Sequence, residues 1–127
     1  IPPVVKTGNL NSMRTWSDVR DAVRAYYMLL TSNPISGECY NIGGNYSCSV
    51  GDMLDHLISI STCKETITVK SEQARFRPID ADLQVPETAK FRNHTGWKPE
   101  IPFEQTMQDL LDYWRGRIGS GTAFLVR

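Results

Sequence analysis

The stretch SDVRDAVRAYYMLLT, residues 17–31, has the clearest periodicity of the chain. Its apolar residues recur at spacings of three and four, with charged residues mostly between them: Val19, Ala22, Val23, Tyr26, Leu29 and Leu30. Such a pattern is typical of an amphipathic helix. It predicts a helix over about 18–31, capped by the Ser17 hydroxyl and ended by Asn33-Pro34.

The residues after this helix predict a strand and then a second helix. Residues 38–42, ECYNI, suit a short buried strand, which Gly43-Gly44 ends. Ser49 precedes Asp52 by three residues, as in a capping box, and predicts a helix over about 50–61.

The rest of the chain continues the alternation of strands and helices. Residues 66–70 alternate and are rich in β-branched side chains, which predicts a strand. A short helix is expected over about 87–94, ended by Gly96. A longer helix begins after Pro102 with a single apolar stripe: Phe103, Met107, Leu110, Leu111 and Trp114. With residues 1–13 expected as extended chain and loop, the fold class is mixed α/β with few, short strands.

The length and net charge of the chain limit its possible functions. The chain has 127 residues, 14 Lys and Arg against 14 Asp and Glu, and 40% apolar residues. One compact domain fits this length. The zero net charge argues against a non-specific nucleic-acid binder and against a binder of anionic membranes. No apolar stretch approaches the roughly 20 residues that span a bilayer, so we expect a cytoplasmic protein.

The two ends indicate a piece of a longer protein. The sequence starts with Ile, and its last residues follow a helix as a flexible and then apolar run. We expect a single, partial domain over 1–127, with residues 119–127 as a flexible tail or a segment foreign to that domain.

Cysteines and histidines show no metal or disulfide pattern. Cys39, Cys48 and Cys63 are odd in number and lack a Cys-x-x-Cys spacing, so we expect reduced, structural thiols. His56 and His94 have no partner at a metal-ligand spacing, and we expect solvated surface histidines and no metal site.

No catalytic set emerges from the sequence. The serines lack a Gly-x-Ser-x-Gly context, and neither histidine has an evident partner for a triad. Gly43-Gly44 lies between a strand and a helix but lacks the third glycine of a dinucleotide-binding turn. We therefore expect a tight turn there and no catalytic residue in the chain.

The polar loop QARFRPID, residues 73–80, is a candidate diphosphate clamp. Arg75 and Arg77 flank one aromatic residue, and a proline fixes the chain before Asp80. The planar guanidinium fork binds phosphate bidentately, and a nearby carboxylate can accept hydrogen bonds from ribose hydroxyls. The alternative is an exposed ion-pair loop.

Arg14 is a second candidate for binding an anion. It lies three residues before the expected helix cap at Ser17, where helix amides and the helix dipole favour negative charge. The alternative is that Arg14 pairs with Asp18 or Asp21.

Five segments, in order, carry a resemblance to a known family: residues 14–21 (RTWSDVRD), 39–43 (CYNIG), 77–80 (RPID), 90–91 (KF) and 96–99 (GWKP). They resemble the C-terminal part of the extended short-chain dehydrogenase/reductases, in particular the GDP-mannose 4,6-dehydratases and GDP-4-keto-6-deoxy-mannose reductases. The resemblance covers about residues 5–118. The sequence departs from the family pattern at residues 85–90, VPETAK, where the family has a Gly-Asp pair. Lys90 still aligns with the family.

This resemblance implies the C-terminal nucleotide-sugar-binding region of such an enzyme, lacking the Rossmann cofactor domain. By resemblance, Arg14 and Arg77 hold the diphosphate of a nucleotide-diphosphate sugar of the GDP-mannose type. Asp80 contacts the ribose or sugar hydroxyls, and Asn9 lines the same pocket.

The family's catalysis rests on NAD(P) and on a Tyr-x-x-x-Lys pair. In this chain Tyr113 comes nearest but is followed by Arg117, and no Gly-rich cofactor turn is present. We expect no dehydratase or reductase activity from this chain alone, and NAD(P) only in a full-length parent.

The resemblance also implies partners. A fragment would expose surfaces that the family packs against its cofactor domain, so we expect a homo-oligomer or a separate Rossmann domain as partner. The alternative function is a non-catalytic interaction or oligomerisation module that retains the fold without binding the ligand.

Overall fold

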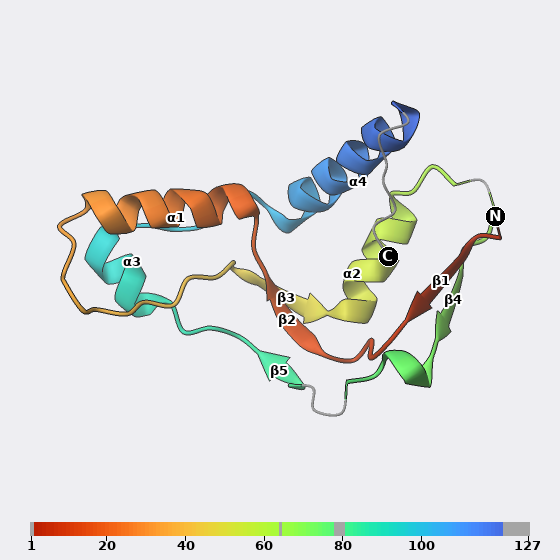
Figure 1. The fold of residues 1–127 in the computed structure, drawn as a ribbon, viewed down its shortest axis with the longest axis horizontal. Helices are drawn as coiled ribbons and strands as arrows, with labels where there is room; N and C mark the ends of the chain where they lie inside the picture. The colour runs from red at the N-terminus through yellow and green to blue at the C-terminus, as the bar shows by residue number, and fades with distance from the viewer. Residues whose placement is uncertain (1, 64, 78–80, 121–127) are drawn as a thin grey trace.

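A computed structural model describes residues 2–63, 65–77 and 81–120. Over these residues the elements are β1 (Val4–Thr7), β2 (Met13–Trp16), α1 (Val19–Thr31), β3 (Tyr46–Ser49), α2 (Val50–Ser59), β4 (Thr68–Ser71), the 3-10 turn η1 (Gln73–Arg75), β5 (Leu83–Gln84), α3 (Ala89–Thr95) and α4 (Phe103–Gly119). The molecule is elongated, with α1 and α3 at one end and β1 and β4 at the other (Figure 1). The predicted α/β class is confirmed.

The strands that the structure describes form two small sheets. β1 and β4 pair in parallel, from Val4 opposite Thr68 to Thr7 opposite Ser71. β2 is the centre of a three-stranded sheet, antiparallel to β3 and parallel to β5. Both sheets therefore join segments that are far apart in the sequence.

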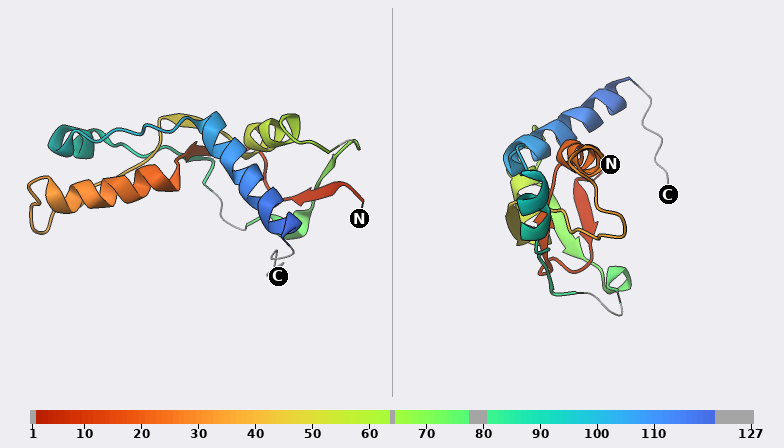
Figure 2. Two further views of the ribbon diagram at one scale, coloured as in Figure 1. Left: turned by 90° about the horizontal axis from the view of Figure 1, so that it is seen from above. Right: turned by 90° about the vertical axis from the view of Figure 1, so that its left-hand side faces the viewer.

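Within the described part of the chain, the interior consists of two separate apolar clusters. The first joins α1 to α3 and the chain after it, around the buried residues Ala25, Phe91 and Trp97. The second joins β3, α2 and α4, around Cys48, Phe103 and Met107. Figure 2 shows α1 with α3 beside it at one end, away from α2.

The predicted helices are confirmed, with small shifts at their ends. α2 begins with the predicted capping box, in which the Asp52 amide donates to Ser49 Oγ at 2.9 Å and the Ser49 amide to Asp52 Oδ2 at 3.0 Å. The predicted helix over 87–94 is α3, which ends at Gly96 as expected. In α4 only the first two residues of the apolar stripe, Phe103 and Met107, are buried.

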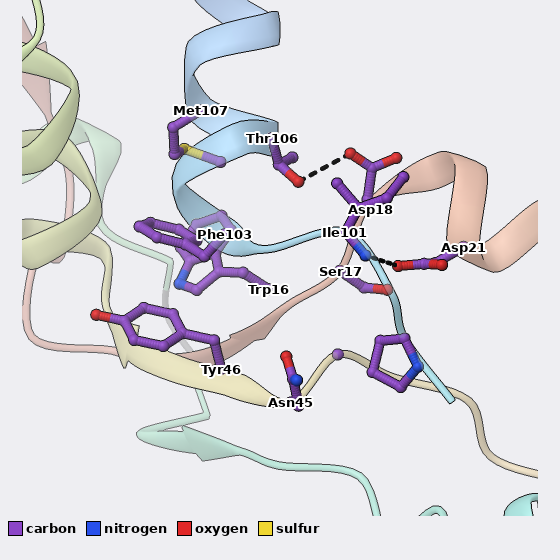
Figure 3. Close-up of a pocket in the computed structure, with 12 residues that line it drawn as sticks. Trp16, Ser17, Asp18, Asp21, Asn45, Tyr46, Ile101, Phe103, Thr106 and Met107 are labelled. Carbon is purple, nitrogen blue, oxygen red and sulfur yellow. Dashed lines mark hydrogen bonds between the residues drawn. The ribbon is translucent and has the colours of Figure 1, made fainter. Parts of the chain in front are cut away.

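The predicted cap of α1 is wrong: Asp18, and not Ser17, caps the helix. Asp18 Oδ1 accepts from the Arg20 amide at 2.8 Å, and its Oδ2 accepts from Thr106 Oγ1 at 2.8 Å (Figure 3). Both residue types can cap a helix, but Asp18 is buried against α4 and Ser17 is exposed. The contact with α4 decides which of them does so.

The predicted strand at 38–42 is also wrong. This segment is irregular, although Tyr40 and Ile42 pack against the first cluster. The ammonium of Lys90, on α3, bonds the Glu38 carboxylate and the Cys39 carbonyl, so a side chain of a helix, and not a neighbouring strand, holds the segment. The strand at this point of the chain is β3, four residues further on.

Other strands differ from the predictions as well. The strand expected at 66–70 is β4, two residues later, and β1 and β2 form in the region expected as extended chain and loop. α4 extends through Gly119, into the predicted tail, and residues 121–127 of that tail lie outside the described residues. None of the helices that the structure describes is long and apolar enough to cross a membrane.

Candidate functional site

The parallel pairing of β1 and β4 creates the candidate site. The Glu72 amide donates to the Thr7 carbonyl at 2.9 Å, and Ser71 Oγ donates to the Gly8 carbonyl at 3.2 Å. In a parallel pair both strands end at the same edge, which is where α/β folds commonly bind ligands. The loop after β1 and the turn η1 after β4 therefore lie next to each other.

Gly8 allows these two segments to approach closely. A Cβ added at Gly8 would lie 2.6 Å from the Arg75 carbonyl oxygen and 3.2 Å from its carbonyl carbon. A side chain there would push the backbone of η1 away. Because Gly8 has no side chain, η1 can lie directly beside the loop that contains Asn9.

An open cleft of about 250 Å³ lies at this junction. It is lined by Gly8, Asn9, Ser12, Arg14, Val50, Arg75 and Arg77. Three of the four residues that the sequence singled out as a binding site, Asn9, Arg14 and Arg77, thus line one cleft, although they lie far apart along the chain. The fourth, Asp80, lies outside the described residues.

Arg14 is positioned by two backbone carbonyls. Its Nη1 donates to the Met13 oxygen at 2.8 Å and to the Ala81 oxygen at 2.7 Å, which links β2 to the chain before β5. The alternative pairing with Asp18 or Asp21 is wrong. Those carboxylates pair with arginines of α1 instead.

The two aspartates at the start of α1 have their own partners. Arg20 bonds Asp18 at 2.8 Å, and Arg24 bonds Asp21 at 2.7 Å. Hydrogen bonds from the Arg20 side chain lower the pKa of Asp18 strongly, although burial opposes this. Burial alone would raise the pKa of Asp21, but the Ile101 amide, Arg24 and the Glu100 amide together lower it.

The helix that meets the cleft is α2 and not α1, which corrects the expectation for Arg14. Val50, the first residue of α2, lines the cleft. Its amide donates to the Ser12 carbonyl at 3.1 Å, and the Gly51 amide donates to the Leu10 carbonyl at 2.8 Å. Because the first amides of α2 are already bonded, side chains and not helix amides are the donors available to an anion.

Asn9 is held by its own loop. Its Nδ2 donates to Ser12 Oγ at 2.9 Å, and its Oδ1 accepts from the Asn11 amide at 3.0 Å. Ser12 is buried, so the loop is anchored at its far end. These bonds fix the position of the Asn9 amide at the edge of the cleft.

Positive charge predominates in the cleft. Arg77 is exposed and makes no hydrogen bond or ion pair with the residues that the structure describes. Arg75 donates from Nε to Glu72 Oε2 at 3.0 Å, and Glu72 also pairs with Lys6 at 2.8 Å. Hydrogen bonds from Lys6 and then from Arg75 lower the pKa of Glu72. The ion pair of Arg75 with Glu72 agrees with the alternative of an exposed ion-pair loop. Arg77 does not agree with it, because it has no such pair among the described residues.

The glycine pair does not fit a dinucleotide cofactor. A Cβ at Gly44 would lie 1.7 Å from the Trp16 carbonyl oxygen, and one at Gly43 would lie 2.5 Å from Pro86 Cγ. The glycines allow two segments of chain to cross, and protein atoms fill the space that a cofactor phosphate would need. Gly43 and Gly44 are therefore not assigned to a cofactor.

The histidines and cysteines differ in part from expectation. His94 bonds the Tyr40 hydroxyl and the Asn33 carbonyl, and His56 lies against Phe103 with ring centres 5.4 Å apart, so neither is a solvated surface residue. Of the three free cysteines, Cys48 is buried while Cys39 and Cys63 are exposed. Among the described residues, no group of three or more His, Cys, Asp or Glu side chains could hold a metal ion.

A second, smaller pocket lies between α1, α4 and β3 (Figure 3). Its volume is about 30 Å³, and Trp16, Phe103 and Met107 supply its apolar wall. Asp18 and Asp21, its charged groups, are already bonded to Thr106 and to the Ile101 amide. This pocket is a small gap in the packing, and no sequence pattern predicted it.

The fold and the matches to known proteins define a class of protein, the extended short-chain dehydrogenase/reductases. The solved structure of RMD from Pseudomonas aeruginosa, complexed with NADPH, matches 91% of this chain and 37% of that chain, with a TM-score of 0.79 at 23% identity. A UDP-glucose 4-epimerase from Thermotoga maritima, solved with UDP-glucose, matches 91% of this chain and 35% of its own, with a TM-score of 0.73 at 21% identity.

The family is more specific than the class. The model of the GDP-mannose 4,6 dehydratase family matches residues 2–110, and the chain belongs to this family. It is 26% identical to the GDP-6-deoxy-D-mannose reductase of Pseudomonas aeruginosa over 114 residues, which cover 90% of this chain and 36% of that enzyme. It is also 26% identical to GDP-mannose 4,6 dehydratase 2 of Arabidopsis thaliana over 105 residues, 83% of this chain and 28% of that enzyme. The chain thus spans about a third of the length of these relatives.

Proposed function

We propose that the cleft between β1, β2 and η1 binds the diphosphate of a nucleotide-diphosphate sugar of the GDP-mannose type. Arg14 and Arg77 hold the diphosphate, Asn9 contacts the ligand at the edge of the cleft, and Asp80 contacts its ribose or sugar hydroxyls. The observation that carries this proposal is the convergence of Asn9, Arg14 and Arg77 on one positively charged cleft.

Chemistry of the side chains supports a phosphate ligand. A guanidinium presents its donors in a planar fork that matches two phosphate oxygens, and such charge-assisted bonds are stronger than neutral ones. Arg77 has all its donors available among the described residues, and Arg14 is held in place by two carbonyls. One arginine is thus ready to bond a ligand, and the other is already oriented.

The relatives support the ligand class. Their names refer to GDP-6-deoxy-D-mannose, GDP-mannose and dTDP-D-glucose. All of these are nucleotide-diphosphate sugars, which share the diphosphate and differ in base and sugar. The match to the GDP-mannose 4,6 dehydratase family favours guanine.

The chain is then the substrate-binding part of an NAD(P)-dependent sugar-nucleotide dehydratase or reductase, with residues 1–127 forming one partial domain. On its own it is not catalytic, since neither a Tyr-x-x-x-Lys pair nor a fitting cofactor turn lies in its sequence. We place such an enzyme in the cytoplasm.

An exposed apolar face on α1 supports a protein partner. Val19, Val23, Tyr26, Tyr27 and Leu30 lie along one side of the helix, and each is at least 60% exposed. Apolar surface of this kind is normally covered. We propose that a second copy of the chain covers it, or else a separate cofactor-binding domain. The same face would serve the alternative function, a non-catalytic interaction module.

Titration calorimetry tests the proposal. We expect the chain to bind GDP and GDP-mannose, and Arg77→Ala to remove this binding, while Arg92→Ala on the distant helix α3 leaves it unchanged. UDP-glucose tests the base, because equal affinity for it would contradict guanine specificity but not the diphosphate clamp. Absence of binding by any of these nucleotides at millimolar concentration would contradict the proposal and favour the interaction module.

A further inference from the structure

Arg75 is the guanidinium of the cleft that the resemblance to the family leaves without a role. It lines the cleft together with Arg14 and Arg77. We propose that Arg75 is a third anion-binding side chain of this cleft and that it makes the cleft prefer a diphosphate over a monophosphate. This inference rests on the proposed function, because it refines how the same cleft recognises its ligand.

Its ion pair leaves the outer edge of the Arg75 guanidinium available. Arg75 Nε donates to Glu72 Oε2 at 3.0 Å, and the other oxygen of Glu72 pairs with Lys6 Nζ on β1 at 2.8 Å. No described residue bonds the two terminal amino groups of Arg75. Since the guanidinium is planar and Nε is occupied, these two groups are the donors that a ligand can reach.

Backbone contacts also hold Arg75 in place. The Arg75 amide donates to the Glu72 carbonyl at 2.9 Å, and the Phe76 amide donates to the Gln73 carbonyl at 3.1 Å. The Arg75 carbonyl lies against Gly8, as described above. A side chain whose position is fixed before binding loses less entropy when the ligand arrives.

Charge explains why the third arginine would favour a diphosphate. Arg14, Arg75 and Arg77 carry three positive charges, and the carboxylate paired with Arg75, Glu72, is shared with Lys6, so positive charge remains in excess. A single phosphate group presents its terminal oxygens at one point of the cleft, where Arg14 and Arg77 are proposed to bond it. A diphosphate spreads its oxygens over two phosphate groups, so it can use a third fork that a monophosphate does not reach.

The test compares GDP with GMP by titration calorimetry, using the full chain. We expect Arg75→Gln to weaken GDP binding about tenfold, because one charge-assisted contact is lost, and to change GMP binding much less. Arg75→Lys keeps the charge but not the fork, and we expect it to restore only part of the GDP affinity. Arg92→Gln is the control, an exposed arginine on α3 with the same change of charge.

The outcomes separate this inference from the proposed function. If wild type binds GDP and Arg77→Ala does not, but Arg75→Gln binds as tightly as wild type, then Arg75 has no such role and the clamp stands. Equal loss of GDP and GMP affinity in Arg75→Gln, together with a lower melting temperature, would show a structural role and overturn the inference. If wild type binds neither nucleotide, both proposals fall.

Discussion

The buried carboxylate of Asp21 accepts a hydrogen bond from the amide of Ile101, 80 residues further along the chain, at a distance of 3.0 Å. The same oxygen accepts from the Glu100 amide at 3.0 Å, and Trp97 Nε1 donates to the Asp21 carbonyl at 3.2 Å. The start of α1 thereby holds the segment that connects α3 to α4. Asp21 thus links the two apolar clusters.

Replacing Asp21 by Asn should destabilise the protein. The asparagine side chain keeps the shape of the aspartate but loses the negative charge that pairs with Arg24. Its NH₂ group is a donor, so it cannot accept the hydrogen bonds of the Glu100 and Ile101 amides. We expect Asp21→Asn to lower the free energy of unfolding by about 2 kcal/mol, as measured by chemical denaturation. Asp55→Asn, on an exposed residue of α2, is the matched control and should change it by less than about 0.5 kcal/mol. Equal effects of the two changes would mean that Asp21 does not hold the connection.

Stability should fall at acid pH. The pKa values of Asp18 and Asp21 are both lowered in the folded protein from an ordinary value of 3.8. A group with a lowered folded pKa stabilises the fold above its unfolded pKa, and this stabilisation is lost as the pH falls toward the folded value. The free energy of unfolding, measured between pH 7 and pH 3, should therefore decrease below about pH 4.5. Asp21→Asn should make this decrease shallower, whereas Asp55→Asn should leave it as steep as in wild type.

A methyl group at Gly8 should damage the cleft. In Gly8→Ala the added Cβ would meet the Arg75 carbonyl at 2.6 Å, so η1 must move and carry the arginines with it. We expect GDP affinity to fall by at least about tenfold, since small displacements of binding groups are costly. Gly116→Ala is the control, because nothing lies within 4 Å of a Cβ there. It should leave GDP binding unchanged and stabilise α4 slightly. Unchanged binding in Gly8→Ala would show that Gly8 does not position the arginines.

The exposed face of α1 should control association. If a second copy covers this face, light scattering of wild type at micromolar concentration gives at least twice the mass of one chain. Leu30→Glu places a charge within the apolar contact and should give single chains. Leu83→Glu, at a similarly exposed leucine of β5, should leave the association intact. A wild-type protein that elutes as a single chain would rule out self-association through α1.

The helices were predictable because their signals are local. An apolar stripe and a capping box lie within one segment, and α2 begins where Ser49 and Asp52 predict. Strands of four residues or fewer carry a weaker signal, and their partners lie far away in the sequence: β1 pairs with residues more than 60 positions later. The segment 38–42 has the composition of a strand, but it is held by side-chain hydrogen bonds to Lys90 and His94 of α3 and not by pairing with another strand. Composition could not reveal that competition.

The candidate site was predictable only in part. The chemistry of the arginines is visible in the sequence, and the resemblance to the family grouped Asn9, Arg14 and Arg77. That Gly8 and Glu72 hold the arginine loop in place could not be predicted, because it depends on the register of β1 and β4. Exclusion of the glycine pair from cofactor binding likewise needed the position of the Trp16 carbonyl.

The pairing of β1 with β4 has a consequence for folding. The two walls of the cleft are joined when residues 4–7 meet residues 68–71, across a segment that contains α1, β3 and α2. Closing so long a loop is slow compared with forming helices. A nascent chain that has emerged only as far as α2 would contain Arg14 but neither Arg75 nor Arg77. If the cleft binds nucleotides as proposed, nucleotide affinity should be acquired late, and its appearance during refolding should mark the completion of this long-range closure.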